Sequence, residues 1–134
     1  MIPEATITIC GRAVEMIYCA AAETGFEDIS GKSVDIFVPD VDRDEKGKVI
    51  KVYQPAATKG DYLKLGFAAI VAAYARKVQD PPITDGEIIY EATPEEIMQL
   101  ITAVVSLRNQ WYNVPEVVKP ETDEPPADDD RKNA

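Results

Sequence analysis

The most suggestive spacing of chemical groups in this sequence is a run of alternating carboxylates, Asp40, Asp42 and Asp44. This spacing matches the first half of a calcium-binding loop. Counted from Asp40, however, the sixth position holds Glu45 instead of glycine, and the twelfth holds Lys51 instead of a bidentate glutamate. Counted from Asp42, the glycine is in place but the twelfth position is a tyrosine. We therefore expect no metal here, and interpret the run as the exposed tip of a hairpin.

Nucleophilic catalysis has equally little support. The 134 residues include no histidine and two cysteines, Cys10 and Cys19, which form no CxxC pair. A cysteine nucleophile needs a base, usually histidine, so both cysteines are expected to be small buried hydrophobes in a reducing compartment. The 24 acidic side chains offer carboxylate pairs, but no pair is marked out by its neighbours. We expect no catalytic residue and no cofactor, hence no enzyme; a small carboxylate-based enzyme is the third-ranked alternative.

The charge balance bears on the partners. With 24 acidic and 14 basic side chains the formal net charge is −10, which repels nucleic-acid phosphates and anionic membrane surfaces. The residues from Met1 to Glu4 do not resemble the start of a secretory signal. The longest apolar run, Leu65–Ala75, is shorter than the roughly 20 residues that span a bilayer. These features predict a cytoplasmic protein that binds neither nucleic acid nor membrane.

The first third of the chain predicts a β-hairpin followed by a short helix. Residues alternate in character over Ala5–Cys10, and the returning strand would be Ala13–Ile17, with a tight turn at the Gly-Arg pair between them. The alanine-rich stretch from Tyr18 favours a short helix, which Gly25 would end in a left-handed conformation.

The middle of the chain predicts a second hairpin and then a long helix. Val34–Val38 and Val49–Tyr53 are β-branched or aromatic runs, separated by the polar segment Pro39–Lys48. We expect these runs to pair as an inserted hairpin with a long exposed tip. Asp61–Val78 has apolar residues at helical spacing and alanine on much of its remaining surface. We expect neighbours to cover this helix on more than one side.

Two capping-box motifs predict the starts of the last two helices. Thr84 and Thr93 are each followed three residues later by a glutamate, and a proline occupies the favoured first helical position after Thr93. We expect a short helix over Asp85–Glu91 and a long one over Pro94–Tyr112.

The last helix carries two apolar stripes. The stripe expected to face the core comprises Ile97, Leu100, Ile101, Val104, Leu107, Arg108 and Trp111. A second stripe follows the heptad beside it through Met98, Val105 and Tyr112, which suggests that the helix also meets another chain. Trp111 and Tyr112 are adjacent aromatic residues that could anchor an interface. The predicted partner-binding residues are therefore Met98, Val105, Trp111 and Tyr112.

The composition changes beyond Pro115. Residues 116–134 contain seven acidic and three basic side chains, several prolines and almost no large apolar residue. They predict a disordered acidic tail. Residues 1–115 predict one α+β domain: an N-terminal hairpin and short helix, an inserted second hairpin, and a bundle of about three helices.

The order of these elements resembles that of the tail assembly chaperones of long-tailed bacteriophages and prophages. The features are an Ile-Thr-Ile-x-Gly-Arg hairpin, a short helix ending in Glu-Thr-Gly, an alanine-rich helix ending in Ala-Tyr-Ala-Arg, a Thr-x-x-Glu helix and a Pro-Glu-Glu helix. The resemblance covers about residues 5–113 apart from the segment 34–53, which looks like an insertion.

The resemblance implies a non-catalytic α+β protein in the bacterial host cytoplasm. Such a protein self-associates, coats the hydrophobic tape measure protein and recruits tail tube protein subunits; some are also made in a longer, frameshifted form. The family has no catalytic residues to transfer. The alternative function is an acidic inhibitor or nucleic-acid mimic that occupies the basic groove of a DNA-binding protein.

Overall fold

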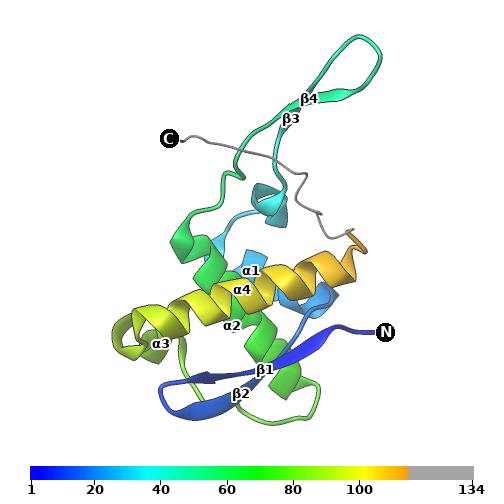
Figure 1. Cartoon of the computed structure of the whole chain (residues 1–134). Coiled ribbons are helices and arrows are strands. Elements are labelled where there is room, and N and C mark those ends of the chain that lie inside the picture. Colours follow the sequence, from blue (N-terminus) through cyan, green and yellow to red (C-terminus); the bar gives the residue numbers. More distant parts are fainter. Residues whose placement is uncertain (115–134) are drawn as a thin grey trace.

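The computed structural model describes residues 1–114, which form two antiparallel hairpins, one short 3₁₀ helix and four α-helices (Figure 1). This arrangement confirms the predicted α+β class. The segment predicted as an acidic tail, 116–134, lies outside the described residues.

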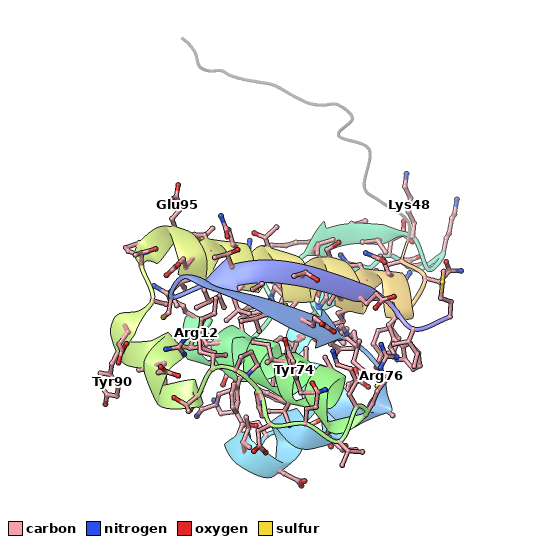
Figure 2. All side chains as sticks on the ribbon, turned by 90° about the horizontal axis from the view of Figure 1, so that it is seen from below. Arg12, Lys48, Tyr74, Arg76, Tyr90 and Glu95 are labelled. Atoms are coloured by element: carbon pink, nitrogen blue, oxygen red, sulfur yellow. The ribbon has the colours of Figure 1, made fainter. Side chains whose placement is uncertain are left out.

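The first hairpin pairs β1 (Glu4–Ile9) with β2 (Arg12–Ile17). The turn lies one residue earlier than predicted, because Cys10 and Gly11 are its two central residues, with φ of 52° and 75°. Both values are positive, as a type I′ turn requires. Val14 and Met16 are buried, and the hairpin packs with β2 beside α2 and β1 beside α4 (Figure 2).

The next helix, α1, spans Ala20–Ser30, so the prediction that Gly25 ends it was wrong. Gly31 ends it instead, with φ of 71° and its N–H donating to the Glu27 carbonyl. Gly25 lies inside the helix, where a Cβ would come 3.5 Å from the Ala68 Cβ. Glycine costs roughly 1 kcal/mol in a helix, and packing of α1 against α2 offsets that cost.

The predicted strand over Val34–Val38 was also wrong. Val34–Phe37 forms a 3₁₀ helix, η1, whose Phe37 ring is buried. The second hairpin does exist, but it pairs β3 (Val41–Arg43) with β4 (Val49–Val52), so its first strand lies inside the segment predicted as the tip. Burial of Phe37 thus overrides the β propensity of this run.

The central helix, α2, spans Lys59–Ala75 and is buried on several sides by α1, α4 and β2, as its alanines predicted (Figure 1). It begins two residues earlier than expected, because Thr58 and Asp61 form a capping box. It also ends three residues before the predicted Val78, which has a positive φ of 57°.

Asp61 is the buried acid of this capping box, with only 4% of its surface exposed. Its carboxylate accepts the Thr58 N–H at 2.9 Å and the Lys32 ammonium at 3.0 Å. Burial alone would raise the pKa of Asp61, but the bonds from Thr58 and Lys32 outweigh it and lower the pKa. A folded-state pKa below the unfolded value stabilises the fold above about pH 4, and that stabilisation is lost as pH falls through the folded pKa.

Replacing Asp61 with asparagine is therefore expected to cost about 1 kcal/mol at pH 7, because the charged partner of Lys32 and of the helix N-terminus is lost. Urea unfolding between pH 7 and pH 2.5 measures the free energy of unfolding of both proteins. The difference between the unmodified chain and Asp61→Asn should become smaller below about pH 4. Asp28→Asn, at an exposed position of α1, is the matched control and should change stability little. If the stability difference between the unmodified chain and Asp61→Asn were the same at pH 2.5 as at pH 7, the charge of Asp61 would not be what stabilises the fold.

The last two helices, α3 (Asp85–Glu91) and α4 (Pro94–Trp111), lie where they were predicted. Both predicted capping boxes are present, at Thr84 and at Thr93. The Glu87 carboxylate of the first box accepts the Thr84 N–H and pairs with Arg12, and these two contacts lower its pKa. The α3 capping box is thereby tied to the first hairpin.

Candidate interaction site

Two of the three alternating carboxylates, Asp42 and Asp44, accept hydrogen bonds within the second hairpin. Asp44 accepts the backbone N–H groups of Lys46 and Lys48, both at 2.9 Å, and so holds the hairpin turn. The segment predicted as the tip, Pro39–Lys48, is exposed, but the tip itself is shorter because β3 occupies Val41–Arg43. Among residues 1–114 no group of three or more His, Cys, Asp or Glu side chains could hold a metal ion. Cys10 and Cys19 are unpaired and partly buried, and burial together with nearby Glu96 raises the pKa of the Cys10 thiol.

The four predicted partner-binding residues differ in exposure and extend along most of α4 and its C-terminal end. Met98 is 60% exposed near the start of α4, whereas Val105 is partly buried against the core. Tyr112 lies 14 positions after Met98, or about 21 Å along a helix. Trp111, beside Tyr112, is 38% exposed, more than a core residue would be.

Tyr112 is held by contacts within the chain. Its hydroxyl donates to the Glu23 carboxylate on α1, and the Arg108 guanidinium lies 4.9 Å from its ring centroid. Burial and the bond to Glu23 raise the pKa of Tyr112 to about 12. Tyr18 donates to the same carboxylate. Tyr112 therefore contributes to joining α4 to α1, a contact that spacing along the helix could not reveal.

Another exposed apolar surface lies on the β3–β4 hairpin, here called the arm (residues 41–52). The arm projects from the helices at one end of the molecule (Figure 1), and every residue of its two strands is exposed. Val41 is paired with Val52, so these two side chains share a face, whereas the register shifts beside them and leaves Ile50 without a partner on β3. Val41, Ile50 and Val52 are 37%, 64% and 62% exposed. These three exposed aliphatic side chains are together called the apolar face of the arm.

The opposite face of the arm is polar and internally bonded. The Tyr53 hydroxyl donates to Asp42 at 2.6 Å, and the Lys51 ammonium lies 4.7 Å from the Tyr53 ring centroid. One face of this two-stranded ribbon is therefore satisfied by its own contacts, whereas the other exposes branched aliphatic side chains. An isolated two-stranded hairpin is at best marginally stable in water. The arm is thus suited to being covered by a partner.

No protein-family model matches the chain, and comparison with curated proteins and with solved structures gives no significant match.

A second apolar feature is a groove between α1 and α2, with a volume of about 170 Å³. The groove exists because Gly25 and four alanines, whose side chains are absent or small, line it, and the exposed Ile29 and Val71 stand on either side. Its lining comprises Ala21, Gly25, Ile29, Phe67, Ala68, Val71, Ala72 and Ala75. Such a groove could accept a large apolar side chain of a partner.

Sequence reasoning missed both the apolar face and the groove. The signal for the arm was Val49-Ile50-Lys51-Val52, which was instead expected to pair with residues 34–38. Gly25, which lines the groove, has the residue type expected at a helix end, but it lies inside α1. None of the helices between residues 1 and 114 has the length and hydrophobicity that a membrane-spanning helix needs.

Proposed function

We propose that this protein is a non-catalytic binding protein of the tail assembly chaperone kind. In this role it self-associates, covers the hydrophobic tape measure protein and recruits tail tube subunits in the bacterial host cytoplasm. The observation that supports binding is the uncovered apolar face of the arm, formed by Val41, Ile50 and Val52. The identity of the clients rests on the resemblance in element order alone.

The arm is proposed as the surface for self-association. Fully burying one valine or isoleucine side chain contributes about 1.5–3 kcal/mol, so covering the exposed parts of three of them supplies useful association energy. Two copies of one face can pack against each other about a twofold axis, because such a contact is self-complementary. Sheets packed in this way lie about 10 Å apart, which leaves room for the branched side chains to interdigitate.

The groove between α1 and α2 is proposed as a client contact. A helical segment of the tape measure protein would present apolar side chains at intervals of three and four residues. One of them would enter the groove between Ile29 and Val71 and contact Gly25 and Ala68. The apolar lining suits a hydrophobic client better than a charged one.

The arm is tested by the double substitution Ile50→Ser and Val52→Ser, with Lys51→Ser on the opposite face as the matched control. We expect the unmodified chain and the Lys51→Ser variant to associate in sedimentation equilibrium, and the double variant to associate at least tenfold more weakly. Its melting temperature should fall little, because the replaced side chains are exposed.

A strictly monomeric protein at high concentration, or equal association of the double variant, would contradict the role of the arm. Association of the unmodified chain that collapses with salt would instead favour the acidic-inhibitor alternative, because contacts between exposed charges are screened. A tape measure reading frame directly downstream of the gene would support the more specific chaperone assignment.

A further inference from the structure

The outer edge of β1 is unpaired within the described residues, since the first sheet contains only β1 and β2. The two-residue turn sets which backbone groups point outward. Ile9 and Arg12 flank the turn and form its closing hydrogen-bonded pair, so Ile7 and Ala5 also bond to β2. The N–H and C=O groups of Thr6 and Thr8 therefore point away from β2, towards the free edge.

The outer edge of β2 differs, because one of its outward backbone N–H groups already has a hydrogen-bond acceptor within the protein. The outward N–H of Glu15 donates to the Tyr74 hydroxyl at 3.1 Å, and Tyr74 reaches it from α2 (Figure 2). At the turn, the Cys10 N–H donates to the Glu96 carboxylate at 3.0 Å. Across residues 1–114 no such acceptor meets the N–H groups of Thr6 and Thr8. The β1 edge is left as a template for pairing.

An open groove of about 680 Å³ runs beside this edge, between β1 and α4. Thr6, Ile7 and Thr8 form its β1 wall. The α4 wall comprises Glu95, Met98, Gln99, Thr102, Ala103 and Ser106. The stretch of α4 from Glu95 to Ser106 is about 17 Å long, close to the length of a strand of five residues. Met98, one of the predicted partner-binding residues, is thus part of this groove.

We propose that the groove binds an extended, basic segment of another protein, which adds to β1 as a third strand. Strand addition supplies backbone hydrogen bonds at Thr6 and Thr8, while alternate side chains of the segment contact Met98 and the hydroxyls of α4. The inference stands on geometry separate from the arm and does not depend on the function proposed above.

The layer beneath the groove favours a single strand over a second copy of this chain. In this chain α4 packs beneath β1. If the β1 strand of a second copy paired at this edge, the α4 helix of that copy would have to occupy the same layer as α4 of the first copy. A lone extended segment carries no such helix. It fills the space above α4 and buries Met98, which is otherwise 60% exposed.

Charge favours a basic segment. Glu95 lies at the rim of the groove and points outward from α4 (Figure 2), and it forms no ion pair with any described residue. The carboxylate of its neighbour Glu96 already accepts hydrogen bonds from the backbone N–H groups of Cys10 and Thr93. A lysine or arginine beside Glu95 would pair with it, and the net charge of −10 would attract the same segment from solution.

The probe is a labelled seven-residue peptide that alternates valine with threonine and carries a lysine at each end. Titration into the full chain should give saturable binding, and hydrogen exchange at the amides of Thr6 and Thr8 should slow at least tenfold. A peptide of the same side chains, methylated on the backbone nitrogens of its five central residues, should bind at least tenfold more weakly, because it cannot donate to the edge.

On the protein side, Thr6→Pro removes one outward N–H, a change that edge strands tolerate, and should weaken binding about fivefold to tenfold. Thr6→Ala keeps the N–H and should bind nearly as the unmodified chain does. Glu95→Gln should weaken binding mainly at low salt. The double arm variant, Ile50→Ser with Val52→Ser, should bind the peptide normally, so that failure of the arm and failure of this edge are separable.

Equal binding of the methylated peptide would overturn the proposal, as would slowed exchange at the arm in place of β1. Protection of Thr6 and Thr8 that rises with protein concentration in the absence of peptide would assign the edge to a second copy, and would also overturn it.

Discussion

Replacing Phe37 with alanine is expected to lower the free energy of unfolding by about 3–5 kcal/mol, the usual cost of deleting a buried aromatic ring. Phe37 is 4% exposed and stands edge-on to both Phe26 and Tyr62, with ring centroids 5.0 Å apart in each pair. The three rings join η1 to α1 and α2. Loss of the Phe37 ring would leave a cavity at the base of the arm.

Urea unfolding followed by circular dichroism measures this effect. The adjacent Val38 is 50% exposed, so Val38→Ala is the matched control and should change stability by only a few tenths of a kcal/mol. If the two substitutions cost the same, the buried position of Phe37 would be incorrect.

The substitution Gly66→Ala is expected to destabilise the protein by about 1–3 kcal/mol, although alanine is the better helix former. A Cβ at Gly66 would lie 2.9 Å from both Cγ and Cδ1 of Leu100, where α2 meets α4. Leu100 is completely buried and its surroundings are packed, so it cannot move away without disturbing the core.

Gly25→Ala is the matched control, because Gly25 also lies inside a helix but its added Cβ would make an ordinary 3.5 Å contact with Ala68. We expect it to raise stability by about 0.5–1 kcal/mol. In a Leu100→Ala background, Gly66→Ala should cost less than it does alone, as thermal unfolding of the four variants of this cycle would show. Equal effects of Gly66→Ala and Gly25→Ala would contradict the close approach of α2 and α4.

Local signals predicted much of the fold. Thr84 and Thr93 with their glutamates fixed the starts of α3 and α4, because a capping box is completed within four consecutive residues. The first hairpin followed from alternation over β1 and a glycine turn, which again involves neighbours in the chain. The predictions failed where residues distant in the sequence determine the local structure. Gly25 is an example, because packing against α2 stabilises a helix that continues through it.

The surfaces were harder to predict than the elements. Met98 was correctly expected to lie on an exposed stripe, but its neighbour in space is β1, and β1 is far from it in the sequence. Tyr112 was placed on the same stripe, yet its hydroxyl is bonded to Glu23, 89 positions away. A helical stripe shows which residues share a face, but it does not show which part of that face another element covers.

The sequence by itself determined the α+β class, the capped helices and the first hairpin, because each depends on residues within a few positions of one another. Only the tertiary structure decided that Phe37 turns inward and leaves Val41, Ile50 and Val52 on an uncovered arm. It also decided that β1 keeps a free edge beside α4. The physical reason is that burial and edge pairing are properties of packed neighbours, and those neighbours are separated by tens of residues along the chain.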